Sequence, residues 1–338
     1  MKRLVILSPN WLGDAVMALP AIADVRRGAP EASLTVAARA AIAPLFGVVP
    51  GIDDIIVLPK PPAIHDVARW RSLGRELAGG GFDAALLLPN SIHSALLASR
   101  AGIAERWGYA TAWRTRLLTR SVPRAAGLHQ VAFYQHLVHA LGFPSGSNEP
   151  RVCVPQTKRD EAARRLTDDG WDGRTPLVAL APGAAYGGAK RWPPEYFGEL
   201  ASALAADGVT SVMVGSAADA ETARLVTHAF RVRSDGSRLH DLTGRTDLPA
   251  LAAVLTICRT LVTNDSGAMH LAAAAGVPVT AMFGPTDDAA TRPLGAAHAV
   301  LTHPVWCRPC MLRECPLDHR CMRGIEVGAV IESARRTL

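Results

Sequence analysis

Short runs of β-branched and aliphatic residues alternate along the chain with alanine-rich stretches of helical character. This alternation is typical of a parallel sheet flanked by helices. In the first half it predicts strands over Arg3–Leu7, Leu34–Ala38, Asp54–Leu58 and Ala84–Leu88, and helices over Ala15–Arg27, His65–Ala78 and His129–Leu141. In the second half it predicts strands over Leu177–Ala181, Ser211–Val214, Thr260–Thr263 and Val279–Phe283, and helices over Glu195–Ala206, Ala218–Phe230, Leu248–Ile257, Ala268–Ala275 and Ile325–Thr337.

Between these halves lies Pro144–Pro155, a stretch rich in Pro, Ser and Gly that we interpret as a linker. The fold class expected is therefore α/β, with two Rossmann-like domains over residues 1–150 and 151–338. Ligands of such sheets bind beyond the carboxyl ends of the strands, so we expect a central cleft there. The last predicted helix, at about 325–338, belongs to the second domain in sequence. It could also pack back on the first domain, and the sequence leaves this open.

Composition excludes several classes of protein. The chain has 338 residues, of which 49% are hydrophobic and 20% charged, so it is long enough for two cores and is not disordered. Its longest apolar stretch, Leu271–Phe283, is broken by Gly276 and Pro278 and is shorter than the roughly 20 residues of a membrane span. The apolar run Leu4–Leu7 is too short for a signal peptide. We therefore expect a cytoplasmic protein.

The positive charge lies mainly in the first half. Residues 1–150 contain 15 Lys and Arg against 10 Asp and Glu, whereas residues 151–338 contain 21 against 20. The densest part is Arg100–Arg124, where Trp and Tyr are interspersed among six arginines and one acidic residue. This segment predicts either a solvated surface loop or a surface for an anionic partner such as a phosphorylated lipid, a nucleic acid or an acidic sugar.

Four of the six cysteines are closely spaced, at Cys307, Cys310, Cys315 and Cys321. In a cytosolic chain they are expected as reduced thiols or metal ligands, because disulfides are rare there. The spacing permits a zinc site but does not form two CxxC knuckles. We favour packed, reduced thiols, and we expect no metal.

The segment Ser8–Asp14 directly follows the first predicted strand. It lacks the G-x-G-x-x-G spacing of a dinucleotide-binding loop, which argues against an NAD-dependent oxidoreductase. Instead it brings the carboxylate of Asp14 to the start of a helix. Asp is a favoured helix N-cap, and a carboxylate at a cleft can also be a general base. The spacing is consistent with both interpretations.

Two segments of the second half are suited to phosphate. Ala181–Pro193 contains Gly187 and Gly188, which allow close approach of backbone amides, and Lys190, which supplies a positive charge; it is not a Walker A loop. Thr263–His270 begins a helix whose free amides suit a pyrophosphate. A flexible turn and an ordinary capped helix are the alternatives for these two segments.

These motifs, in this order, resemble those of glycosyltransferase family 9, the ADP-heptose:lipopolysaccharide heptosyltransferases. The resemblance rests on Pro9–Met17, Tyr186–Pro193, Thr263–His270 and Phe283–Thr286 and spans nearly the whole chain. The tail Cys307–Leu317 is most similar to the heptosyltransferase II branch. The resemblance implies a GT-B fold and inverting transfer of heptose from ADP-L-glycero-β-D-manno-heptose to the first heptose of Kdo2-lipid A. It also implies that neither a metal nor another cofactor is required.

The resemblance further implies roles for individual residues. Asp14 would be the general base, and Lys190 with the Ser266 and Gly267 amides would stabilise the departing ADP. The residues expected in the donor site are Gly187, Gly188, Lys190, Glu221, Asp265, Ser266, Gly267 and His270, with Glu221 preferred to Asp219 for the ribose. The residues expected to bind the acceptor are Asn10, Arg114, Arg116 and Arg120.

The partner of the basic first half would then be an anionic lipid on the cytoplasmic face of the inner membrane, met peripherally through Arg100–Arg124. Two alternatives are kept. One is a family member that adds the first or a later heptose. The other is a non-catalytic nucleotide- or nucleic-acid-binding module, against which stands the absence of the usual nucleic-acid-binding motifs.

Overall fold

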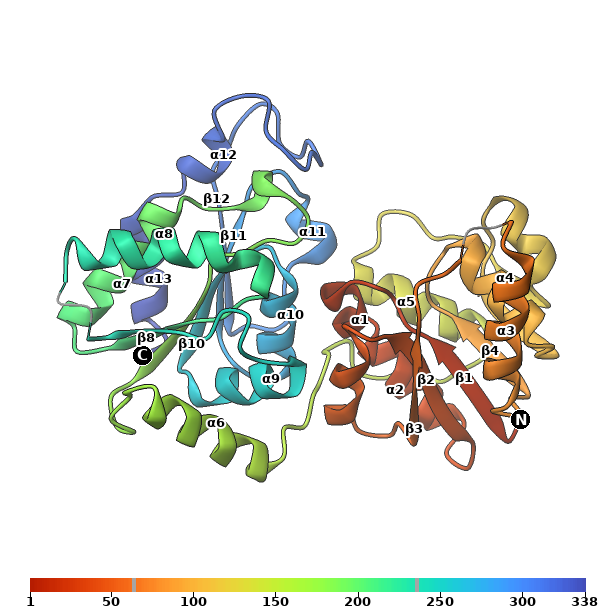
Figure 1. The fold of residues 1–338 in the computed structure, drawn as a ribbon. Coiled ribbons are helices and arrows are strands. Elements are labelled where there is room, and N and C mark those ends of the chain that lie inside the picture. Colours follow the sequence, from red (N-terminus) through yellow and green to blue (C-terminus); the bar gives the residue numbers. More distant parts are fainter. Residues whose placement is uncertain (63–64, 235–236) are drawn as a thin grey trace. The chain divides into compact units, whose positions relative to one another are not determined.

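The computed structural model describes residues 1–62, 65–234 and 237–338. The chain divides into two compact units, Met1–Pro150 and Arg151–Leu338. Each unit contains a six-stranded sheet with parallel strand pairs, and helices cover both faces of each sheet (Figure 1). The expected α/β fold class with two Rossmann-like sheets is confirmed.

The sheet of the first unit has the strand order β3-β2-β1-β4-β5-β6. Its strands are β1 (Arg3–Leu7), β2 (Ser33–Arg39), β3 (Asp54–Leu58), β4 (Ala84–Leu87), β5 (Glu105–Tyr109) and β6 (Arg120–Val122). Its α-helices are α1 (Leu12–Met17), α2 (Leu19–Gly28), α3 (Val67–Ala78), α4 (Ile92–Arg100) and α5 (Gln130–Ala140). Helix α5 packs on α1 and α2, and α3 packs on α4.

Burial explains why these segments form a sheet. In β1 the run Leu4–Leu7 is buried on both faces, as expected of a central strand in a parallel sheet covered by helices. On the side of α3 and α4, Trp70 and Leu97 share one buried cluster with Val5 and Leu87. The sheet and its helices thus hold the ends of β1 and β4 in fixed positions.

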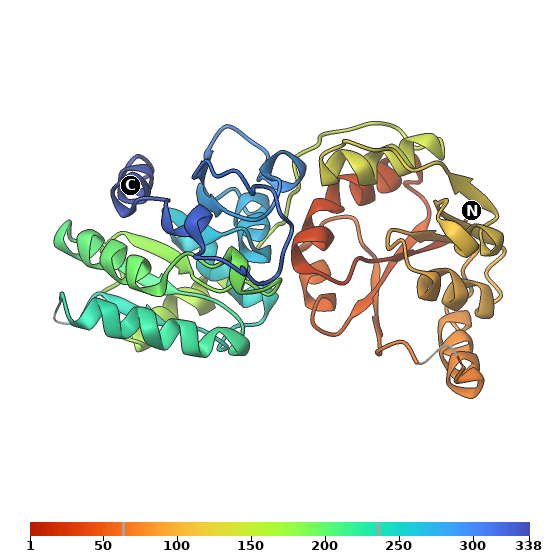
Figure 2. The ribbon, with the colours of Figure 1, turned by 90° about the horizontal axis from the view of Figure 1, so that it is seen from above.

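The sheet of the second unit has the strand order β12-β11-β10-β7-β8-β9. Its strands are β7 (Leu177–Ala181), β8 (Thr210–Met213), β9 (Leu239–Asp241), β10 (Thr260–Asn264), β11 (Val279–Phe283) and β12 (His298–Thr302). Its α-helices are α6 (Gln156–Asp168), α7 (Pro194–Ala206), α8 (Ala220–Arg231), α9 (Leu248–Ile257), α10 (Gly267–Ala274), α11 (Asp288–Thr291), α12 (Arg320–Arg323) and α13 (Val327–Arg335). Helices α7 and α8 lie side by side (Figure 2), and α6 packs on α9.

The last helix, α13, packs against α7, β10 and β11 of its own unit. Its Val330 and Ala334 are buried in the same cluster as Trp192 and Phe197. This apolar face of α13 is therefore part of the core of the second unit.

Several elements differ from those predicted. The helix predicted over Ala15–Arg27 is divided at Ala18 into α1 and α2, since Pro20 in the first turn of α2 lacks an amide hydrogen for a continuous helix. The basic segment Arg100–Arg124 is not a loop throughout, because it contains β5 and β6. The sequence patterns also did not predict helices α4 and α6 or strands β9 and β12. In the part of the chain that the structure describes, no helix has the length and hydropathy needed to cross a membrane.

Candidate functional site

Each sheet changes direction beside its first strand. Strand β7 lies between β8 and β10, and β1 lies between β2 and β4, so the connections from these strands diverge. In open α/β sheets, ligands bind at such points, beyond the carboxyl ends of the strands. The motifs identified in the sequence follow β1, β7 and β10, and they therefore lie at these two sheet ends.

At the sheet end of the second unit, Lys190 and Asp265 form an ion pair. Lys190 ends the short 3-10 turn after β7, and Asp265 directly follows β10. Lys190 Nζ lies 2.5 Å from Asp265 Oδ2, and the side chains are 12% and 6% exposed. The same oxygen accepts a hydrogen bond of 2.7 Å from Thr286 Oγ1. The structure thus brings together two of the expected donor-site residues and adds Thr286.

The start of helix α10 lies next to this ion pair, because Asp265 precedes the N-cap residue Ser266. No side-chain hydrogen bond caps this helix in the described structure; the Ser266 hydroxyl instead lies 3.0 Å from Thr263 Oγ1. The first amides of a helix lack intrahelical partners and can receive an anion. His270, on the same helix, is buried at 6% exposure. The amides of Ser266 and Gly267 thus directly follow, along the chain, the residue that pairs with Lys190.

A buried amide side chain fixes the two loops relative to each other. Asn264 Oδ1 accepts a hydrogen bond of 2.9 Å from the Trp192 amide, and Asn264 Nδ2 donates one of 2.8 Å to the Pro182 carbonyl. Asn264 is fully buried, so breaking these bonds would leave unpaired polar groups at a cost of about 1–3 kcal/mol each. The geometry of the site after β7 depends on β10 through this residue.

The two acidic candidates for the ribose differ sharply in environment. Asp219 is buried, and its Oδ2 accepts hydrogen bonds from the amide and hydroxyl of Ser216. Glu221 is on the exposed first turn of α8 and pairs with Arg224, whose hydrogen bond and charge hold the pKa of Glu221 below its usual value. Asp219 therefore shapes the turn after β8, and its Oδ1 lies 4.0 Å from Arg191 Nη2. Glu221 is the more exposed of the two acids, and its role at the ribose stays a prediction.

In the first unit, Asp14 is half-buried in the first turn of α1. The N-cap position of this helix is Trp11 rather than Asp14, so the interpretation of Asp14 as an N-cap is wrong. Tyr134 of α5 lies near Asp14: burial, and then the negative charge of Asp14, raise the pKa of the Tyr134 hydroxyl, which therefore stays protonated. A carboxylate in this position is suited to accept a proton from a ligand hydroxyl.

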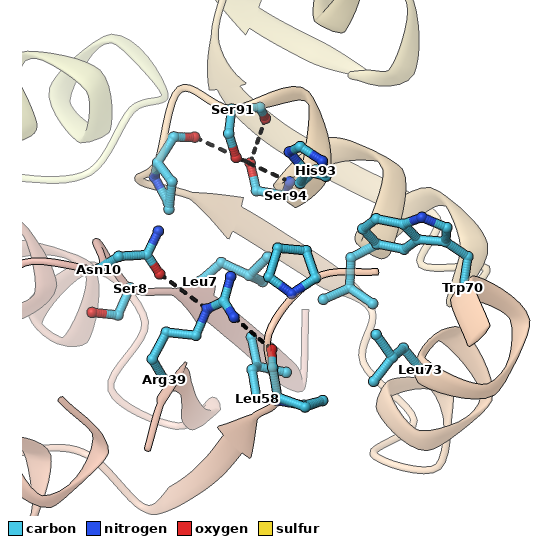
Figure 3. Close-up of a pocket in the computed structure, with 14 residues that line it drawn as sticks. Leu7, Ser8, Asn10, Arg39, Leu58, Trp70, Leu73, Ser91, His93 and Ser94 are labelled. Carbon is cyan, nitrogen blue, oxygen red and sulfur yellow. Dashed lines mark hydrogen bonds between the residues drawn. The ribbon is translucent and has the colours of Figure 1, made fainter. Parts of the chain in front are cut away.

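A pocket lies at the same sheet end of the first unit, lined by residues that follow its four neighbouring strands (Figure 3). Asn10 Oδ1 accepts a hydrogen bond of 3.2 Å from Arg39 Nε, and Arg39 Nη1 donates one of 2.7 Å to the Pro59 carbonyl. Burial lowers the pKa of Arg39. On the opposite wall, the rings of Trp70 and His93 stack with centroids 5.8 Å apart. The pocket offers a cation, hydroxyls and apolar surface, a combination that suits an anionic sugar.

The arginines of Arg100–Arg124 do not form one exposed surface, contrary to expectation. Arg114 is 2% exposed and donates hydrogen bonds to Asn90 Oδ1 and the Leu87 carbonyl, both at 3.1 Å. Burial lowers its pKa to about 10. Arg106 donates hydrogen bonds to the Leu117 and Ile103 carbonyls. These two guanidinium groups stabilise loops around β5.

The other two predicted acceptor residues of this segment are exposed. Arg116 lies over the ring of Trp113, 4.7 Å from its centroid, and Trp113 itself is 67% exposed. Arg120 lies over the ring of Trp107 and donates a hydrogen bond of 3.0 Å to the Leu141 carbonyl. Of the four acceptor candidates, Asn10 lines the pocket and the arginines do not.

All six cysteines are free thiols in the structure. Among the described residues, no group of His, Cys, Asp and Glu is arranged to hold a metal ion. Cys321 is buried, and burial followed by the charges of Cys315, Cys307 and Cys310 raises the pKa of its thiol.

Sequence reasoning missed Thr286, Arg39 and Tyr134. Thr286 lies in the motif Phe283–Thr286, three residues after the end of β11, so its place at the sheet end was predictable although its contact with Asp265 was not. Arg39 ends β2, where the rule for ligand sites in α/β sheets would also have found it. Tyr134 carried no signal, because only the packing of α5 on α1 brings it to Asp14.

Known proteins are similar to this chain in sequence and in fold. The model of "Glycosyltransferase family 9 (heptosyltransferase)" matches residues 70–320. Lipopolysaccharide heptosyltransferase 2 of Escherichia coli K12 is 31% identical over 298 residues, which cover 86% of this chain and 85% of that protein. Lipooligosaccharide heptosyltransferase 2 of Haemophilus ducreyi is 29% identical over 312 residues, covering 88% of each chain.

Among solved structures, that of ADP-heptose lps heptosyltransferase II from E. coli superposes with a TM-score of 0.85 at 29% sequence identity. The match covers 100% of this chain and 98% of that one. A family 9 glycosyl transferase from Veillonella parvula, at 24% identity and a TM-score of 0.86, has the same fold over 99% of this chain and 97% of that one.

Proposed function

The chain belongs to glycosyltransferase family 9 and has the GT-B fold, and on this premise we propose that it transfers heptose from ADP-heptose to the inner core of lipopolysaccharide. The observation that carries the proposal is the pairing of Lys190 with Asp265 beside the start of helix α10. A cation and free amides at one sheet end suit the diphosphate of a nucleotide sugar. The acceptor we propose is Kdo2-lipid A that bears one heptose.

The proposed reaction is an inverting displacement. Asp14 takes the proton from the acceptor hydroxyl as its oxygen attacks the anomeric carbon, and the bond from that carbon to the ADP oxygen breaks. Negative charge then develops on ADP, where Lys190 and the amides of Ser266 and Gly267 stabilise it. Asp265 would hold heptose hydroxyls, His270 would assist at the phosphates, and Glu221 would bind the ribose. No metal or cofactor has a role in this scheme.

The proposed acceptor site is the pocket after β1 and β4. Asn10 and Arg39 supply polar groups there, and the acceptor's acidic sugars match the positive charge of Arg39. We also propose that the protein is cytoplasmic and meets the inner membrane peripherally. The exposed Arg116 and Trp113 support such an encounter, since a cation beside an aromatic ring suits an anionic lipid surface.

The test is release of ADP from ADP-heptose with Kdo2-lipid A acceptors that carry no, one or two heptoses. We expect release with the one-heptose acceptor and loss of roughly 10²-fold or more in Asp14→Asn. Asp54→Asn, at the exposed start of β3, is the matched control and should retain activity. Release with another acceptor would correct the acceptor, and equal rates for wild type and Asp14→Asn would exclude Asp14 as the base.

A further inference from the structure

We propose that Arg313, in the cysteine-rich tail, is a second phosphate-binding cation of the donor site. The inference rests on the proposed function, which places the diphosphate of the donor beside Lys190. Arg313 lies in the tail Cys307–Leu317, to which no part in the reaction has been assigned so far. The contacts of the tail with the loop after β7 indicate such a part for Arg313.

Hydrogen bonds connect the tail to two loops of the donor site, the loop after β7 and the loop after β11. The Arg313 carbonyl accepts a hydrogen bond of 2.9 Å from the Ala189 amide, inside the turn that carries Lys190. Tyr186 Oη donates a hydrogen bond of 2.7 Å to the Met311 carbonyl. The Met311 amide in turn donates one of 2.9 Å to the Pro285 carbonyl, next to Thr286. The residues before and after Arg313 are thus held at the carboxyl ends of β7 and β11.

Two glycines make this approach possible. A Cβ atom at Gly187 would lie 2.2 Å from the Arg313 carbonyl oxygen, a contact that no side chain tolerates. At Gly188 it would lie 2.5 Å from Glu314 Oε2, and the Gly188 amide donates a hydrogen bond of 2.9 Å to Glu314 Oε1. Gly187 and Gly188, which the sequence motif predicts to lie close to phosphate, therefore also allow the tail to pack against this loop.

The guanidinium group of Arg313 and the ammonium group of Lys190 share one aromatic ring. Both cations lie over the ring of Tyr186, with Arg313 Cζ 5.2 Å and Lys190 Nζ 4.7 Å from its centroid. The two groups are therefore separated by no more than about 10 Å. Arg313 is exposed, and among the ion pairs of the described residues none includes it. A cation over an aromatic ring, without a carboxylate partner, is placed to meet a ligand.

The charge balance of this turn favours a second cation, because two carboxylates, Asp265 and Glu314, lie beside it. The charge of Lys190 is compensated by Asp265, so the pair together offers the diphosphate little net positive charge. A diphosphate leaving group gains negative charge as the glycosidic bond breaks, and stabilisation is most effective where that charge develops. The planar guanidinium donates two parallel hydrogen bonds to phosphate oxygens, which an ammonium cannot do.

The experiment compares binding of ADP and of adenosine to the full chain by titration calorimetry. In Arg313→Ala we expect ADP affinity to fall on the order of tenfold, with adenosine affinity unchanged and the salt dependence of ADP binding reduced. Arg313→Lys should recover part of the loss. The matched control is Arg320→Ala, which removes a tail arginine that is paired with Asp318. It should bind ADP as the wild type does.

Three results overturn the inference: equal ADP affinity in Arg313→Ala and wild type, an equal loss for adenosine, or the same loss in Arg320→Ala. These outcomes leave the proposed function intact if the wild type still transfers heptose. Conversely, an ADP affinity that depends on Arg313 in a protein that transfers no heptose would support the diphosphate site and refute the proposed reaction. A wild-type protein that does not bind ADP would refute both.

Discussion

Lys190 Nζ lies 2.5 Å from Asp265 Oδ2 at the carboxyl end of the second sheet. Both side chains are nearly inaccessible to water, so each charge depends on the other for compensation. Removing one partner of such a pair leaves an uncompensated charge, which destabilises a protein more than removing both. The pair therefore has separable effects on stability and on activity.

The first prediction concerns this pair. Asp265→Asn and Lys190→Met should each lower the free energy of unfolding by about 3–5 kcal/mol, because each leaves one buried charge unpaired. The double variant should recover part of this loss, with a coupling energy of at least about 1 kcal/mol. All three variants should lose transfer activity, since the cation and the carboxylate have separate roles toward the donor. Urea unfolding and ADP release measure the two effects, and additive losses of stability would contradict the coupling.

The second prediction concerns Thr286, which donates a hydrogen bond to Asp265 and is 5% exposed. Thr286→Val keeps the shape but removes the donor, so Asp265 is held less firmly and kcat should fall roughly tenfold. Thr286→Ser should restore most of the rate. ADP affinity should change little, because Thr286 acts through Asp265 and not on the diphosphate. A valine variant with wild-type kcat would show that the hydrogen bond is not used.

The sequence predicted well the strands that contain a continuous apolar run, both the buried central ones and the edge strand β3. β1, β3, β7 and β11 were predicted with their observed bounds. Strand β5 was missed, since it begins with Glu105 and Arg106 and its apolar residues are aromatic. The short edge strand β6 begins with Arg120 and was missed for the same reason. Charged strand ends look like loops when only composition is considered.

The site was predictable where it follows directly from position along the chain. Residues at the ends of β7 and β10 were identified from their motifs, and the structure pairs Lys190 with Asp265. Contacts that depend on tertiary packing were not predictable: Thr286 with Asp265, and Arg313 with Tyr186. The burial of Arg114 also had no sequence signal, because an arginine among aromatics is equally consistent with a surface.

The third prediction concerns thiol reactivity. The thiolate is the reactive form, and burial raises the pKa of Cys258 to about 12. At pH 8 only about one in 10⁴ of these thiols is therefore ionised. Iodoacetamide should modify the exposed Cys153 and Cys310 in the folded protein, and Cys258 only after denaturation. Peptide mapping by mass spectrometry gives the order, and early modification of Cys258 would contradict its burial.

The last prediction separates the arginines of the segment Arg100–Arg124. Arg114 is buried, so Arg114→Met should lower stability without affecting binding to vesicles that contain anionic lipid, provided the protein remains folded. Arg116→Ala should weaken that binding several-fold at low salt, because a cation near an anionic surface contributes about 1 kcal/mol. The difference should disappear at high salt, since screening removes the attraction. Vesicle sedimentation at two salt concentrations tests this. If Arg116→Ala bound as tightly as wild type at low salt, the basic segment would have only the structural role that Arg106 and Arg114 already show.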